Sequence, residues 1–265
     1  MKAAARSAAL IAAVLAATPA AAQSHWTFSL APYIWLPNIN GTLRYDPPPS
    51  SATRPEVETG PNDYLENLDF ALMIAAEARK GDWAFLTDII YLDFSDESAQ
   101  VKSVSGPGGI VQGTLDTGSE TSLKALVWQV AASRALSRGP RDTFEVLGGV
   151  RYVRLETALD WRLAGSAGGF AQSGNLSQKK DLTDAIVGVR GQARLGEGQW
   201  FVPYYLDVGG GSSSLTWQGV AGIGYAFKWG EALLNYRHLY YDQGSDKLVQ
   251  ELEFSGPALG VRFRF

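Results

Sequence analysis

Residues 181–195 contain the pattern that decides the fold. From residue 184 the chain reads Asp184-Ala185-Ile186-Val187-Gly188-Val189-Arg190-Gly191-Gln192-Ala193-Arg194-Leu195. All charged and amide side chains fall on alternate positions, and the intervening positions carry only Ala, Val, Gly and Leu. Because successive side chains of a β-strand point to opposite faces, this period of two predicts a strand with one polar and one apolar face.

The same weak alternation recurs along most of the chain. It predicts strands at about residues 26–36, 69–79, 83–94, 119–136, 143–162, 181–195, 199–208, 215–228, 232–243 and 253–265. The connections alternate between tight turns and longer segments rich in Gly, Ser or Pro, which is typical of transmembrane barrels. We therefore expect an all-β fold, a transmembrane antiparallel up-and-down β-barrel of about ten strands, with twelve or eight as alternatives.

Two long segments, residues 37–68 and 95–118, are predicted to be external loops. Asn38-Ile39-Asn40-Gly41 is a candidate hairpin turn, and a return strand at residues 42–45 that reached the membrane would allow twelve strands. Residues 46–64 contain five prolines, so we expect no regular strand there. Residues 46–68 then either form an external loop or fold over the pore. Loops are also predicted at about residues 164–180, 209–214 and 244–252.

The first 22 residues have the organisation of a secretory signal peptide. Lys2 and Arg6 precede an apolar stretch at residues 7–17, and Ala20-Ala21-Ala22 forms a small-residue cleavage site before Gln23. The expected mature domain is therefore residues 23–265. Its longest charge-free run, residues 208–227, includes three glycines and three serines in succession, so we expect no transmembrane helix.

Composition excludes several classes of function. The 265 residues include no cysteine and two histidines, and the formal net charge is −4. We expect no disulfide, no metal site, no cofactor and no nucleic-acid partner. His238 falls on the predicted lipid face and Asp93, Asp96 and Glu97 at a solvated loop base, so no catalytic residue is predicted. An outer-membrane hydrolase or acyltransferase is the less favoured alternative.

Charged residues on the strands are predicted to line the lumen. A lysine or arginine facing lipid at mid-depth costs about 2–4 kcal/mol, so the alternation places these side chains inside. The predicted lumen-lining residues are Glu77, Arg79, Asp88, Arg151, Asp184, Arg190, Arg194, Asp207, Arg237 and Arg262. Arg190 and Arg237 are expected near the centre. The lining predicts either a narrow, mildly cationic pore for small anions or neutral solutes, or a ladder of ion pairs that fills the lumen.

Aromatic residues near strand ends are predicted to lie at the two membrane interfaces. They are Trp26, Trp83, Tyr91, Trp200, Trp217 and Phe227.

The terminal stretch Gly260-Val261-Arg262-Phe263-Arg264-Phe265 resembles the C-terminal β-signal of Gram-negative outer-membrane proteins. Gly260, Phe263 and Phe265 occupy the signal positions. The resemblance implies recognition by the barrel assembly machinery during biogenesis.

A wider resemblance rests on the opening Trp26-x-Phe28-x-Leu30-Ala31-Pro32-Tyr33-Ile34-Trp35 through Asn40-Gly41, on Asn67-Leu68-Asp69 and on Tyr236-Arg237. These segments resemble a proteobacterial family of outer-membrane β-barrel proteins, related in type to small OmpA-, OmpW- or porin-like barrels. The resemblance implies a location in the Gram-negative outer membrane, with outer-membrane lipid and lipopolysaccharide as surroundings.

The favoured function is a narrow passive pore or small-solute channel with an arginine-rich polar lumen. The alternative is a structural or surface-binding barrel whose lumen is filled.

Overall fold

The computed structural model describes residues 25–43, 56–59, 61, 65, 68–96, 104–105, 112–113, 120–139, 141–164, 171–244 and 249–265. The predicted signal peptide and most of the predicted loops at 37–68 and 95–118 lie outside these ranges. Among the described residues, no helix has both the length and the apolarity needed to cross a membrane.

The described chain is built almost entirely from β-strands. They are β1 (Thr27–Trp35), β2 (Asn38–Leu43), β3 (Glu56–Thr59), β4 (Leu68–Lys80), β5 (Trp83–Asp96), β6 (Val104–Ser105), β7 (Gln112–Gly113), β8 (Glu120–Arg138), β9 (Asp142–Ala164), β10 (Ala171–Arg194), β11 (Trp200–Gly211), β12 (Leu215–Ala226), β13 (Gly230–Asp242) and β14 (Val249–Arg264).

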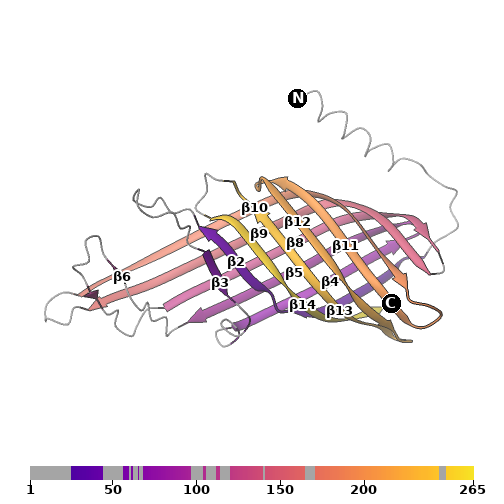
Figure 1. Ribbon diagram of the computed structural model, residues 1–265, viewed down its shortest axis with the longest axis horizontal. Coiled ribbons are helices and arrows are strands. Elements are labelled where there is room, and N and C mark those ends of the chain that lie inside the picture. Colours follow the sequence, from indigo (N-terminus) through magenta and orange to yellow (C-terminus); the bar gives the residue numbers. More distant parts are fainter. Residues whose placement is uncertain are drawn as a thin grey trace, which may run out of the picture.

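Ten of these strands close into an antiparallel barrel (Figure 1). Their order around the barrel is β1-β4-β5-β8-β9-β10-β11-β12-β13-β14, and β14 pairs with β1 to close the ring. The predicted ten-strand up-and-down barrel is therefore confirmed. Closure matters energetically because it leaves no strand edge of the ring unpaired.

The predicted hairpin turn at Asn38–Gly41 is wrong. β2 continues β1 along the same partner: Trp35 pairs with Ala258 of β14, and Asn38 pairs with Ser255 without a change of register. Because β14 is 16 residues long, it offers hydrogen-bonding groups well beyond the end of β1. The Asn-Gly pair therefore lies in an extended strand, and no additional barrel strand arises from it.

The expectation that residues 46–64 hold no regular strand is also wrong. β3 pairs with β2 through Ile39–Thr59 and Gly41–Val57. Its four residues contain no proline, and it forms the outer edge of the sheet extension. A proline-free edge segment between prolines can therefore pair, because only one of its sides must supply hydrogen bonds.

Three further loop predictions are wrong in extent. β9 and β10 pair continuously up to Ala164 and Ala171, so all of residues 171–180 are strand rather than loop. β11 runs through Gly211, and the connection to β12 is confined to residues 212–214. An added Cβ at Gly209 would lie 2.1 Å from the carbonyl oxygen of Ala185, so glycine there allows close strand packing. β14 begins at Val249, inside the predicted loop at 244–252.

The two ends of the barrel differ. One, called here the short-turn end, carries the tight connections β4–β5, β8–β9, β10–β11 and β12–β13, together with the start of β1 and the end of β14. It lies on the right of Figure 1, near the C-terminus. The opposite end is called here the long-loop end. The two strands of the β9–β10 hairpin, which connect there, have 23 and 24 residues, whereas β11 has 12. About 9–11 residues suffice to cross a bilayer, so this hairpin projects far beyond the ring.

Candidate functional site: the barrel lumen

Alternation sorts the side chains into a lumen-facing and an outer face. On β10, Asp184 and Ile186 are buried inside, while Val187 is 44% exposed on the outer face. On β4, Glu77 and Arg79 face the lumen and Phe70 and Leu72 are exposed outside. The ring therefore has an apolar outer surface and a mixed interior, as the period of two requires.

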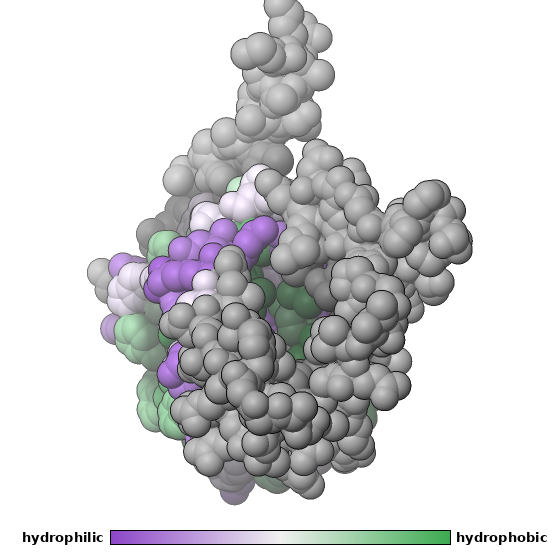
Figure 2. Space-filling view, turned by 90° about the vertical axis from the view of Figure 1, so that its left-hand side faces the viewer, coloured by the Kyte–Doolittle hydropathy of each residue, from purple (hydrophilic) through white to green (hydrophobic). Residues whose placement is uncertain are grey.

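An apolar layer lies inside the barrel on the side of the long-loop end. Leu239 and Tyr241 on β13 are fully buried, and they pack with buried side chains from six other strands. The layer consists of Trp35, Met73, Ile90, Val153, Leu182, Leu239, Tyr241 and Ala258. Figure 2 looks at the molecule from the long-loop end and shows hydrophobic residues deep in a hollow.

Sequence reasoning missed this layer, although a signal for it exists. Leu182 lies two positions before Asp184, Val153 two after Arg151, and Leu239 two after Arg237. Residues two apart on a strand share a face, so each apolar side chain is the next lumen-facing residue beyond a charged one. The prediction followed the charged positions alone and ignored the apolar residues on the same face.

The first charged group next to this layer centres on Arg151. Its guanidinium forms an ion pair with Asp207, and both side chains are fully buried. Arg151 also donates to the Gln129 amide oxygen, at 2.8 and 3.1 Å, and to the Thr216 hydroxyl at 3.1 Å. The Tyr205 hydroxyl donates to Asp207 at 2.5 Å. Every charge of this group is thus compensated inside the protein.

A second charged group centres on Arg237. Its guanidinium donates to Asp88 at 2.9 Å, to the Tyr33 hydroxyl at 2.9 Å and to the amide oxygen of Gln218 at 2.7 Å. The guanidinium also lies 4.9 Å from the ring centre of Trp35 in the apolar layer, within cation–π range. Arg237 therefore joins four different strands and connects the polar interior to the apolar layer.

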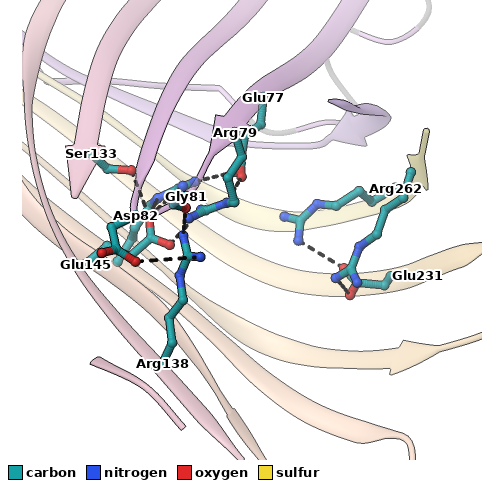
Figure 3. A network of polar contacts seen from close by, with 11 residues as sticks. Glu77, Arg79, Gly81, Asp82, Ser133, Arg138, Glu145, Glu231 and Arg262 are labelled. Atoms are coloured by element: carbon teal, nitrogen blue, oxygen red, sulfur yellow. Dashed lines mark hydrogen bonds and ion pairs between the residues drawn. The ribbon is translucent and has the colours of Figure 1, made fainter. Parts of the chain in front are cut away.

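The third charged group lies nearer the short-turn end and links four charged side chains (Figure 3). Arg79 contacts Glu77 at 2.7 Å and Glu145 at 2.6 Å. Arg190 contacts the same two carboxylates, at 2.9 and 2.7 Å. The Ser133 hydroxyl donates to Glu145 at 2.7 Å. Glu145 was absent from the predicted lumen set, although its position on β9, six residues before Arg151, places it on the same face.

The remaining predicted lumen residues lie apart from these groups. Arg262 contacts Glu231 at 2.9 Å near the short-turn end, and Arg264 pairs with the same carboxylate. Asp184 is buried and accepts hydrogen bonds from the backbone and hydroxyl of Ser213, at 2.7 and 2.8 Å, so it fixes the β11–β12 turn. Arg194 is exposed near the end of β10.

A cavity of about 720 Å³ occupies the half of the lumen nearer the short-turn end. Its wall includes residues from the start of β1, such as Thr27, and from the end of β14, such as Arg264. Its inner end includes Tyr33 and Ala258, which pack in or against the apolar layer. Six arginines line it: Arg79, Arg138, Arg190, Arg237, Arg262 and Arg264.

The predicted interface aromatics lie on the outer face. Trp26, Trp83, Trp200 and Phe227 are exposed close to the short-turn end, where Phe227 and Trp229 stack at 5.2 Å. Tyr91 and Trp217 lie nearer the long-loop end and are half-buried. The ring of His238 stacks on Trp217 at 4.3 Å, outside the barrel.

The terminal residues form part of the closing seam. Gly260 pairs with Tyr33 and Phe263 with Leu30, and Phe265 is 76% exposed. An added Cβ at Gly260 would lie 2.8 Å from the Cβ of Tyr33, so glycine there lets the first and last strands pair closely. Within the part of the chain that the structure describes, no group of three His, Cys, Asp or Glu side chains could hold a metal ion.

Several solved structures of outer-membrane barrels are similar to this chain. The outer-membrane protease OmpT from Escherichia coli aligns over 94% of this chain and 99% of its own, with 9% identity and a TM-score of 0.50. The translocator domain of the autotransporter NalP from Neisseria meningitidis aligns over 100% and 96%, with 14% identity and a TM-score of 0.42. The toluene transporter TodX from Pseudomonas putida aligns over 92% and 90%, with 9% identity and a TM-score of 0.35.

No protein-family model matches the sequence, and no curated protein matches it. At such low identities the structural likeness shows the fold alone. The chain thus has the closed ten-strand antiparallel architecture of outer-membrane barrels.

Proposed function

We propose that this protein is a Gram-negative outer-membrane barrel with a closed lumen, and that it works through the surface projecting at its long-loop end. Three observations support the membrane setting: the apolar outer face, the exposed aromatic residues at the short-turn end and the shared fold. In that setting the short-turn end faces the periplasm and the long-loop end faces outward. Export by residues 1–22, biogenesis through the barrel assembly machinery and contact with lipopolysaccharide belong to the same proposal.

The apolar layer is the observation that supports the closed lumen. The apolar layer spans the interior with side chains that are at most 9% exposed. Next to it, Arg151 and Asp207 neutralise each other's charge in an ion pair, and neither side chain is exposed to solvent. A hydrated path for ions would have to separate the packed apolar side chains, so a permanently open pore does not fit this interior.

Conductance in planar bilayers tests the closed lumen. We expect the refolded protein to give no steady single-channel current. The double variant Trp35→Ala, Tyr241→Ala removes the two largest side chains of the layer and is expected to give one. A steady current from the unmodified protein would refute the closed lumen. Silence of a correctly folded double variant would show that the charged groups alone suffice to close it.

A separate experiment tests the role of the surface that projects at the long-loop end. Replacing residues 157–178 with an Asn-Gly turn shortens the β9–β10 hairpin and leaves the ring intact. In a strain that lacks the gene, the shortened protein is expected to fold but not to restore the deletion phenotype. Restoration equal to that of the full protein would contradict a role for the projecting surface.

A small-solute channel is the second candidate, and the arginine-lined cavity favours it. This function requires the apolar layer to open in response to a solute or to voltage. Currents that appear only above a threshold voltage would support it.

A further inference from the structure

The cavity at the short-turn end has a property that a closed barrel does not need: its accessible charge is positive. Arg262, Arg264 and Arg138 have side chains that are 34%, 60% and 36% exposed. Glu231, which pairs with Arg262 and Arg264, is only 3% exposed, and the deeper Glu145 is 5% exposed, whereas Asp82 beside Arg138 is 46% exposed. A solute that enters past Arg262 and Arg264 therefore meets guanidinium groups before it meets Glu231 or Glu145.

The charge count in the wall supports the same conclusion. Six arginines line the cavity, against three carboxylates, Glu77, Asp88 and Glu145. Glu231 lies against Arg262 and Arg264, and Asp82 lies 3.8 Å from Arg138 outside the wall. These two acids reduce the excess but leave it positive. In a concave site with low-dielectric walls, such an excess concentrates anions.

Apolar side chains complete the wall and indicate the kind of anion. Ala31, Leu86, Val220 and Leu233 line the cavity together with the arginines, and so do Tyr33 and Tyr205. The volume of about 720 Å³ lies within the range of small-molecule sites. Guanidinium groups bind carboxylates and phosphates through paired hydrogen bonds, while apolar walls suit a hydrocarbon or aromatic body.

We propose that this cavity is a binding site for a small organic anion that enters from the short-turn end, the periplasmic side in the proposed setting. The ligand class is an amphiphilic carboxylate: its charge contacts Arg138, Arg262 and Arg264, and its apolar body packs against Leu86 and Leu233. The site does not depend on transport, because the cavity exists whether or not the apolar layer opens.

An experiment with a single thiol tests whether the electrostatic potential in the cavity is positive. The chain contains no cysteine, so Ser29→Cys introduces one thiol into the cavity wall. Gly198→Cys places a matched control in the β10–β11 turn at the same end, where an added Cβ meets nothing within 4 Å. We compare labelling by an anionic and a cationic methanethiosulfonate. The ratio of anionic to cationic rates is expected to be about tenfold higher at position 29 than at position 198.

Arginine variants then locate the effect. Arg138→Gln with Arg264→Gln removes two of the accessible charges while Arg262 still pairs with Glu231, and it should abolish the difference between the two positions. Lys228→Gln is the control, since Lys228 is exposed in the β12–β13 turn at the same end and does not line the cavity. If the Lys228 variant also lost the preference for the anionic reagent, the effect would come from the general charge of this surface, and the proposed site would be overturned.

Ligand binding is tested with phthalate as the probe and its uncharged diamide, phthalamide, as the isosteric control. Phthalate is expected to protect the thiol at position 29 from a neutral labelling reagent in a saturable manner and to leave position 198 unprotected. Phthalamide should protect neither position. No protection by phthalate, or equal protection by phthalamide, would overturn the proposal. Heat-modifiable migration on a detergent gel confirms that each variant is folded.

Discussion

The two halves of the lumen are built by the same strands but differ in their access to solvent. Towards the long-loop end, the interior is dry: the layer around Leu239 and the Arg151–Asp207 pair are sealed from solvent. Towards the short-turn end, the charges border a cavity, and Arg190 and Glu77 are 17% and 22% exposed. The comparison shows that the loss of stability on removing one partner of an ion pair depends on how deeply the remaining charge is buried. The number of ion pairs in each half does not decide it.

The largest effect is expected in the dry half. Asp207→Ala leaves the guanidinium of Arg151 buried without a carboxylate, and breaking such a pair costs about 3–5 kcal/mol. Urea unfolding of the refolded protein in detergent micelles measures this loss. The double change Arg151→Met, Asp207→Leu removes both charges and should be markedly more stable than Asp207→Ala. A single variant within about 1 kcal/mol of the parent would contradict a dry interior.

The apolar layer should show the next largest effect. Leu239→Ala leaves a void among packed side chains, at an expected cost of about 2–5 kcal/mol. Leu234→Ala is the matched control on the same strand, because Leu234 is 52% exposed on the outer face. The same unfolding measurement should give a much smaller loss for the control. Equal losses would indicate that the layer is loosely packed.

Arg190→Met tests the half that borders the cavity. It leaves Glu77 and Glu145 with Arg79 as their shared partner and with water nearby, so the loss should be smaller than for Asp207→Ala, about 1–3 kcal/mol. Equilibrium unfolding under identical conditions compares the two variants. If Arg190→Met proved the more destabilising, the cavity would not hydrate the residues around it.

The smallest effect is expected on the projecting hairpin. Asp181 lies beyond the last β10 residue that pairs with β11, and a hydrogen bond from Arg154 lowers the pKa of its carboxyl, with a further contribution from Tyr152. A lowered folded-state pKa stabilises the fold above the unfolded-state value and loses this contribution as pH falls through the folded-state value. The difference in unfolding free energy between the parent and Asp181→Asn should therefore be small near neutral pH and vanish in acid. A difference that grows on acidification would contradict the assignment.

Local pattern was enough to predict the ring, because the period of two and the short turns are properties of neighbouring residues. The segment at 171–180 was predicted to be part of a longer loop, of the kind rich in Gly, Ser or Pro, yet it pairs with β9 through the backbone. Alternation also predicts which side chains face the lumen. It does not predict the partners of Arg237, because Asp88 and Tyr33 lie 149 and 204 residues away and meet it only after the ring closes. The cavity depends on the same long-range register.

The β1–β14 seam has a consequence for the time course of folding. Its two strands are separated by nearly the whole described chain, so the loop-closure entropy must be overcome before their contacts form. Arg237 lies on β13 next to β14, whereas Tyr33 lies on β1. Their hydrogen bond can form only in a closed ring, and the indole of Trp35 donates to Gly256 across the same junction. These contacts therefore form after closure and hold together a junction whose opening would expose both strand edges.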